Sequence, residues 1–104
     1  MITALVQYKL PPEISREDCE KHFHGIAPGF RSVPGLHRKN FICADDGWAG
    51  GVYLWETRED AERFYTGPWR DGIRSRYHMD PVIKYFDTFA ITDNVVTDAG
   101  VRLL

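Results

Sequence analysis

The spacing of apolar residues alternates along the chain between a two-residue period, typical of strands, and a helical period. The strand-like runs, most of them bounded by Pro, Gly or Asp, are residues 2–10, 36–44, 51–56 and 80–92. Helical segments follow the first and third runs, with Ser15 and Thr57 in place as N-caps. The order β-α-β-β-α-β predicts an α+β protein with a ferredoxin-like, split βαβ fold. We expect one domain, residues 1–92, followed by a tail at residues 93–104.

Prolines interrupt both helical patterns. Pro28 lies inside the first pattern, where it should kink or restart the helix because it lacks the backbone amide. The second pattern stops at Gly67, and Pro68 suits the first turn of a further helical segment that runs through Ile73. Such a break would lift the helix layer away from the sheet, so that Trp69 covers the opening of a cavity.

Apolar residues occupy both faces of the strand-like runs. In the first run Leu5 points away from the other apolar side chains, and in the third run every residue of Val52–Trp55 is apolar. A sheet with this pattern is covered on both faces. The helical segments can cover only one face, so we expect a second copy of the chain to cover the other, giving a homodimer.

Composition and charge exclude several classes of protein. With 104 residues, 27% of them charged, and a net charge of -2, the chain has the profile of an ordinary globular domain. It lacks the basic excess of nucleic-acid-binding proteins, and no apolar run approaches the ~20 residues that span a membrane. The N-terminus lacks the basic start and the cleavage site of a signal peptide. We therefore expect a cytoplasmic protein that binds neither nucleic acid nor membrane.

Sequence motifs for metal or cofactor binding are missing. His22 and His24 are two residues apart on a predicted helix, so they point to different sides and cannot share an ion. Cys19 and Cys43 fit no CxxC pattern and are expected to be small buried residues in a reducing compartment. No glycine-rich phosphate loop and no HExxH pattern occurs. We expect neither a metal nor a bound cofactor.

Segments that together cover most of the chain carry a resemblance to a known family. They are MITALVQYKLPPEISRE, VPGLHRKNF, GGVYLWETREDAERFY, PWRDGIRSRY and PVIKYFDT. From Met1 to Asn94 the chain resembles the small monooxygenases of the YdhR-like group, in the dimeric α+β barrel superfamily. The resemblance implies a ferredoxin-like subunit that dimerises through its sheet and holds a pocket between helices and sheet. Relatives in the superfamily oxygenate polyketide phenols without metal or flavin, and others degrade haem, cyclise or isomerise polyketides, or dehalogenate or decarboxylate small rings.

Few polar residues could carry out chemistry in such a pocket. Oxygenation through the anion of the substrate needs one group to take the proton and a cation to stabilise the charge. We expect His22 or Tyr53 to take the proton and Arg38 to stabilise the anion. Because Arg38 and Lys39 are consecutive strand residues, at most one of them can face the pocket. We expect that residue to be Arg38.

The predicted pocket wall is mostly aromatic, with a few polar groups. Its expected members are Trp69, Tyr65, Trp55, Gln7, Arg74 and Tyr77. The aromatic residues also suit a core or an interface. For Arg74 we also expect, and for Arg76 we only expect, a place on a solvated helix face.

Two classes of function are compatible with these residues. In the first, the protein is a cofactor-independent monooxygenase that acts on a small electron-rich aromatic or polyketide-like substrate. A polyketide cyclase or isomerase would use the same residues without oxygen. In the second class, the protein is a non-catalytic dimer that binds a small aromatic or hydrophobic molecule. Oxygen consumption with aromatic substrates distinguishes the two classes.

Overall fold

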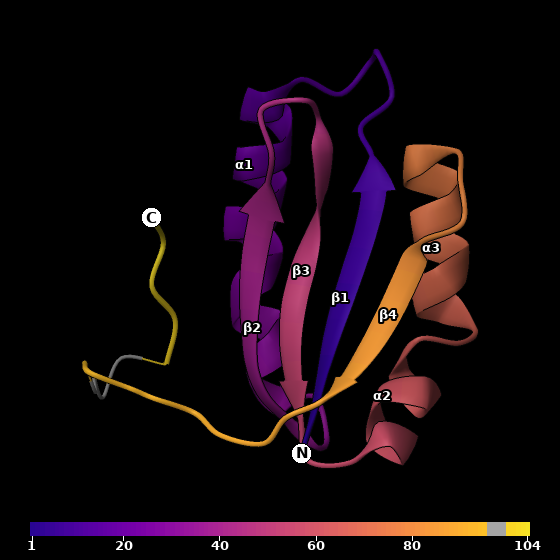
Figure 1. The fold of residues 1–104 in the computed structure, drawn as a ribbon. Helices are drawn as coiled ribbons and strands as arrows, with labels where there is room; N and C mark the ends of the chain where they lie inside the picture. The colour runs from indigo at the N-terminus through magenta and orange to yellow at the C-terminus, as the bar shows by residue number, and fades with distance from the viewer. Residues whose placement is uncertain (96–99) are drawn as a thin grey trace.

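Antiparallel strands form a single four-stranded sheet in residues 1–95 and 100–104, the part of the chain that the structure, a computed structural model, describes. The elements in chain order are β1 (Ile2–Lys9), α1 (Arg16–Ile26), the 3₁₀ helix η1 (Ala27–Ser32), β2 (Leu36–Cys43), β3 (Trp48–Trp55), α2 (Arg58–Phe64), α3 (Pro68–Tyr77) and β4 (Val82–Asp87). The strands lie in the order β2-β3-β1-β4, as Figure 1 shows. The predicted α+β fold with a ferredoxin-like arrangement is confirmed.

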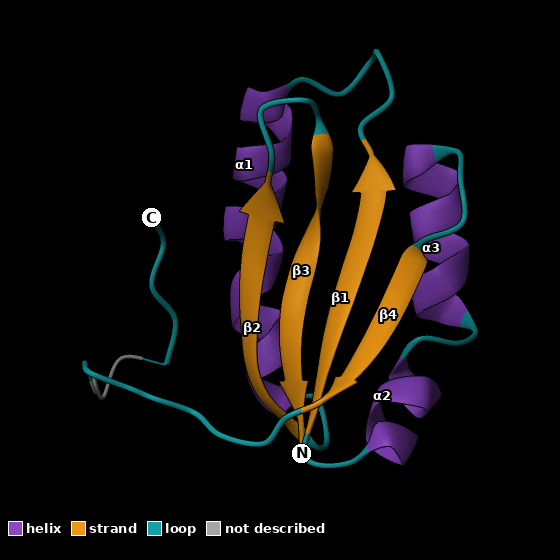
Figure 2. Cartoon of the chain, viewed as in Figure 1, coloured by secondary structure: helices purple, strands orange, loops and turns teal. Residues whose placement is uncertain are grey.

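The helices all cover the same face of the sheet. In Figure 2 they lie behind the strands, and the face turned to the viewer carries no helix. Along β1 the residues Ala4, Val6 and Tyr8 are buried on the helix side, whereas Leu5 lies on the open face between them. The core therefore lies between the helix layer and one face of the sheet, and the open face is left with half-buried apolar side chains.

Side-chain caps begin the helices where the sequence predicts them. The Ser15 hydroxyl accepts a hydrogen bond from the Asp18 amide at 3.0 Å, and the Asp18 carboxylate accepts one from the Ser15 amide, which completes a capping box. The Thr57 hydroxyl accepts from the Asp60 amide at 3.1 Å. At Pro28 the chain tightens into η1 and continues in the same direction, so this proline restarts the helix.

Strand and helix ends differ from the prediction in three places. β3 begins at Trp48, earlier than expected, and α3 continues past Ile73 to Tyr77. β4 ends at Asp87, so residues 88–92 are not strand. The cause of this early end is the register, because Asp87 pairs with Ile2 at the start of β1 and no strand residue lies beyond it.

The predicted tail is only partly described, because residues 96–99 lie outside the described residues. Asp93 contacts Arg38 of β2, and the Leu104 carbonyl lies 3.3 Å from Nε2 of His24 on α1. Both cysteines are free thiols; Cys19 is buried, as expected, and Cys43 is half-buried. Among the described helices, none combines the length and the apolar character needed to cross a membrane.

Candidate functional site

A cavity of about 280 Å³ lies between the helix layer and the sheet. Strands contribute Tyr8, Lys39 and Tyr53 to its lining, and the helical segments contribute His22, Ile26, Phe30, Pro68, Trp69, Gly72, Ile73, Arg76 and Tyr77. Its size is slightly below the ~300–1,000 Å³ of typical ligand pockets. It therefore suits a ligand of one or two rings.

The amine of Lys39 is enclosed by aromatic rings at this cavity. Its Nζ atom lies 3.7 Å from the ring centroid of Phe30, 3.9 Å from that of Phe41 and 4.6 Å from that of Tyr53. Burial lowers the pKa of Lys39 to about 6. The ring faces favour the ammonium form, but among the described residues no carboxylate forms an ion pair with it. Lys39 is thus an amine that can accept a proton near neutral pH.

The glycine at position 51 makes room for Lys39. Gly51 lies on β3 opposite Phe41, next to Lys39 on the neighbouring strand. A Cβ atom built on Gly51 would lie 2.8 Å from Cε of Lys39 and 2.9 Å from Cε1 of Tyr53. These separations are shorter than packed carbon atoms tolerate, so the lysine side chain can extend over β3 on the helix-covered face only because residue 51 has no side chain.

Arg38 lies on the opposite face of the sheet, contrary to the expectation that it faces the pocket. It pairs with Leu54 of the open face, whereas Lys39 pairs with Tyr53 of the helix-covered face. A register shift between Leu36 and Arg38 sets this alternation. Arg38 forms an ion pair with Asp93 at 3.1 Å, and both side chains are half exposed. Lys39, not Arg38, is therefore the strand cation at the cavity.

The expected residues His22, Tyr53, Trp69 and Tyr77 do line the cavity. Burial lowers the pKa of His22, and the neighbouring Arg76 and Lys39 lower it further, so its imidazole is neutral at pH 7. Burial raises the pKa of Tyr53. Tyr53 therefore remains a phenol at neutral pH and can donate a hydrogen bond, but it is a poor candidate for taking a proton.

Two aromatic residues expected in the wall belong to the core behind it. Trp55 and Tyr65 are 0% and 2% exposed, and the Trp55 indole N–H donates to the Tyr65 hydroxyl at 3.0 Å. Neither is among the residues that line the cavity. The Tyr65 ring packs against Trp69, with centroids 4.9 Å apart. These residues hold Trp69 in position but do not reach a ligand themselves.

Two expected polar residues lie outside the cavity. Gln7 alternates along β1 with the buried Val6 and Tyr8, so it belongs to the open face. Arg74 is exposed on α3, where its guanidinium pairs with Asp80. Strand alternation turns Gln7 to the face opposite the cavity, and the helical period turns Arg74 to solvent.

Arg76 is a cavity residue that the sequence interpretation assigned to a solvated helix face. It lies on α3 beyond the predicted end of the helix, and it is only partly exposed. Its Nε atom is buried, with no hydrogen-bond partner in the described part of the chain. Beside it, the Tyr77 ring stacks on Tyr8 with centroids 3.9 Å apart. No sequence motif marks Arg76, because its direction depends on how α3 packs.

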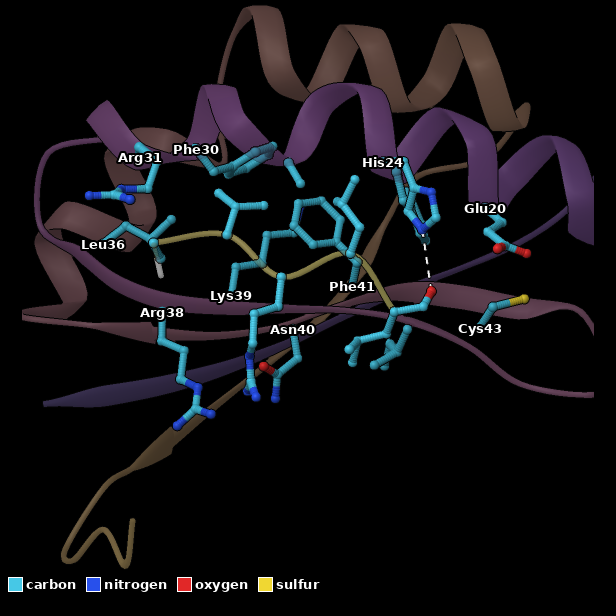
Figure 3. A pocket seen from close by; sticks show the side chains of 18 of the residues that line it. Glu20, His24, Phe30, Arg31, Leu36, Arg38, Lys39, Asn40, Phe41 and Cys43 are labelled. Carbon is cyan, nitrogen blue, oxygen red and sulfur yellow. Dashed lines mark hydrogen bonds between the residues drawn. The ribbon is translucent and has the colours of Figure 1, made fainter. Parts of the chain in front are cut away.

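A second hollow, a groove of about 960 Å³, runs along the outer side of β2 and α1 and is partly lined by residues 100–104. Figure 3 shows this groove, with Arg38 extending away from the helices and the hydrogen bond at His24 drawn as a dashed line. The groove is open and bordered by the chain's own C-terminal residues. Over residues 1–95 and 100–104, no group of three or more His, Cys, Asp or Glu side chains is placed to hold a metal ion.

Comparisons with known proteins agree with this fold. No protein-family model matches the chain, and no curated protein matches its sequence. The structure of a monooxygenase from ActVA-Orf6 of Streptomyces coelicolor, in complex with nanaomycin D, has a TM-score of 0.65 and 17% identity over 89% of this chain and 92% of that chain. An antibiotic biosynthesis monooxygenase has a TM-score of 0.65 and 12% identity over 86% and 100% of the two chains. A protein of unknown function from Nitrosomonas europaea has a TM-score of 0.72 and 9% identity over 91% and 95%.

At these identities the likeness concerns the fold. The chain shares its ferredoxin-like fold with the structures of a monooxygenase and of an antibiotic biosynthesis monooxygenase. Its site must be interpreted from its own residues.

Proposed function

We propose that the protein is a cofactor-independent monooxygenase of the YdhR-like group that acts on a small, electron-rich phenol or enol. The observation that carries this proposal is the position of Lys39. Its amine has a pKa of about 6, lines an aromatic cavity, and has no carboxylate partner among the described residues. An amine in this setting can take the proton of a phenol and then stabilise the resulting anion as an ammonium.

The reaction needs no electrons from outside the substrate. Proton transfer from the substrate hydroxyl to Nζ of Lys39 gives an electron-rich anion, which passes an electron to O₂. Recombination adds both oxygen atoms to a ring carbon, and loss of water leaves a quinone oxygen. One oxygen atom of O₂ thus enters the substrate and the other leaves as water. The two hydrogens of that water are the hydrogen of the attacked ring carbon and the hydroxyl proton that Lys39 returns, so that a ring C–H becomes a carbonyl group.

Other cavity residues support this sequence of steps. The Tyr53 hydroxyl remains protonated and can donate to the developing anion, and neutral His22 can move a proton toward solvent because it is only partly buried. Trp69 and the stacked pair Tyr8 and Tyr77 provide apolar walls. Exclusion of water strengthens each of these interactions. The Streptomyces coelicolor structure is a monooxygenase in complex with nanaomycin D, which supports an oxygenation on this fold.

We further propose that the working unit is a homodimer formed through the open face of the sheet. This face carries the apolar residues Leu5, Val52, Leu54 and Phe86. Phe86 is 42% exposed. Contiguous apolar surface of this kind is rare on monomers. In this arrangement the cavities lie on the helix side of each subunit, away from the interface.

Oxygen uptake with anthrones and dihydroxynaphthalenes, measured in the presence of a chelator and without flavin or nicotinamide, tests the proposed function. We expect uptake of one O₂ per quinone formed, and loss of this activity in Lys39→Met. Arg38→Met is the matched control, because it changes the neighbouring strand residue on the opposite face. Absence of uptake across the panel, or turnover of the same substrates without oxygen, would contradict the monooxygenase proposal.

A further inference from the structure

The cavity combines several basic side chains with no acidic one. Lys39, His22 and Arg76 all line it, and the lining contains no Asp or Glu among the residues that the structure describes. Lys39 and Arg76 both lower the pKa of His22, so the three groups lie within electrostatic reach of one another. The remaining titratable groups of the lining are Tyr8, Tyr53 and Tyr77. A cavity of this kind favours an anion.

Arg76 is the basic group of the lining that lacks a hydrogen-bond acceptor among the described residues. Its Nε atom is buried without an acceptor in the described residues, although a guanidinium is charged at every accessible pH. Leaving such a donor unsatisfied destabilises the folded protein, because the donor has lost its water and gained no partner. Arg76 also lines the cavity and forms no ion pair among the described residues, so its guanidinium is the charged group there that a ligand anion can pair with.

The acidic group whose pKa Arg76 lowers does not satisfy Arg76. Asp18 on α1 is close enough for Arg76 to lower its pKa slightly, as the last of several causes. However, Asp18 is exposed and its carboxylate already accepts a hydrogen bond from the Ser15 amide at 3.2 Å. Cys19, also on α1, is a buried thiol whose pKa burial raises to about 11, so it carries no negative charge. Neither group offers Arg76 an acceptor inside the cavity.

We infer that the natural ligand is an aromatic carboxylate, with its carboxylate bound by Arg76 from the helix layer while its ring lies between Trp69 and the Tyr8–Tyr77 pair. This inference rests on the proposed function in one respect. It makes the oxygenase substrate a hydroxylated aromatic acid, with Lys39 from the sheet acting on the hydroxyl and Arg76 on the carboxylate. The cavity volume of about 280 Å³ limits the ring system to one or two fused rings.

A binding experiment tests this assignment without requiring turnover. The probes are 2-naphthoate and 2-naphthamide, which have nearly the same shape but differ in charge, and neither has a hydroxyl group to oxidise. Titration calorimetry at pH 8 measures both dissociation constants, because Lys39 is then mostly neutral and Arg76 is the charge under test. We expect the wild-type protein to bind the acid at least about tenfold more tightly than the amide, as a charge-assisted hydrogen bond would give.

The variants separate Arg76 from its neighbours. Arg76→Gln should abolish the preference for the acid, and Arg76→Lys should keep part of it. Arg74→Gln should leave it unchanged, because Arg74 is an arginine of the same helix that lies outside the cavity. If Arg76→Gln fails to fold, Arg76→Lys still tests the inference, because the lysine keeps the charge and loses the fork of donors. A reduced preference for the acid in Arg76→Lys would support the inference, and an unchanged preference would contradict it.

Several outcomes would overturn the inference. They are equal binding of acid and amide by the wild-type protein, absence of binding by both, and a preference for the acid that survives Arg76→Gln. Because the probes are not substrates, a protein that prefers the acid but consumes no oxygen would refute the proposed function and keep the carboxylate site. A protein that oxidises neutral phenols but shows no preference for the acid would support the proposed function and refute the carboxylate site.

Discussion

The side chain of Lys39 extends over β3 at Gly51, and the absence of a side chain at residue 51 is what allows it to reach the aromatic cavity. A methyl group at this position would lie 2.8 Å from Cε of Lys39. Two features that look unrelated in the sequence, a glycine inside a strand and a lysine on the next strand, are therefore parts of the same site. A glycine in a strand interior often marks such a close approach.

Gly51→Ala should displace the Lys39 amine from its rings. We expect it to lower the free energy of unfolding by ~1–3 kcal/mol, the usual cost of overpacking, and to reduce oxygenation. Urea denaturation and oxygen uptake measure the two effects. Gly25→Ala on α1 is the control, because a Cβ there meets nothing within 4 Å, and we expect it to be neutral or slightly stabilising. Full stability and activity of Gly51→Ala would show that the lysine does not need this position.

Lys39→Met should remove the group that takes the substrate proton while keeping an apolar side chain of similar length. We expect kcat/KM to fall by about 10²-fold or more, the range for loss of a general base. In the wild-type protein kcat/KM should rise with pH as Lys39 loses its proton, with a midpoint near its pKa of about 6. Arg38→Met should change little. If instead Arg38→Met is the damaging substitution, the strand face assigned to the site is wrong.

The depressed pKa of Lys39 also predicts how stability depends on pH. Between about pH 6 and the usual lysine range near 10.5, the unfolded chain binds a proton at Lys39 that the folded protein does not. This group therefore makes the folded state more stable as pH rises through that window, and it is most destabilising at and below pH 6. Lys39→Met should raise the free energy of unfolding at pH 7 by ~1–4 kcal/mol and flatten the profile between pH 6 and 10. Chemical denaturation at a series of pH values measures how the free energy of unfolding depends on pH in both proteins. The same slope in the wild-type protein and in Lys39→Met would mean that Lys39 stays charged in the folded protein.

Local patterns in the sequence were enough to predict most of the fold. The alternation in β1 and the caps at Ser15 and Thr57 are properties of neighbouring residues, and the structure contains them as predicted. The end of β4 is different, because it depends on where the partner strand begins. Asp87 lies opposite Ile2, and residues 88–92 have strand-like composition but no strand to pair with.

The site was harder to predict, because small shifts decide which side chains meet. Counted by simple alternation from the inward-facing Leu36, Arg38 would face the helices; the register shift between them turns Lys39 inward instead. Nothing local in the sequence marks that shift. Arg76 was assigned to solvent for a similar reason, since its direction follows from the packing of α3 against β1, where Tyr77 stacks on Tyr8.

The open sheet face predicts assembly. We expect light scattering at micromolar concentration to give about twice the chain mass of 12.0 kDa. Leu54→Glu places a charge in the centre of this face and should give a folded monomer, because burying an unpaired charge in an interface is costly. Arg63→Glu, on the exposed surface of α2, should remain dimeric. A wild-type protein of a single chain mass would refute the dimer and leave the open face without a partner.

The last prediction concerns Trp69, which follows the helix break at Gly67 and Pro68. Gly67 has φ 54° and ψ -125°, a conformation that other residues rarely adopt, and this turn directs Trp69 into the cavity lining. Its ring packs on Tyr65 and lies 5.8 Å from the Phe64 ring centroid, so it is supported from behind. Trp69→Phe should weaken 2-naphthoate binding by less than about tenfold, because most of the apolar wall remains, whereas Trp69→Ala should weaken it by about tenfold or more. Calorimetric titration of both variants measures the difference. Equal binding by Trp69→Ala and the wild-type protein would show that the ligand lies elsewhere, and the cavity would then have to be excluded as the site.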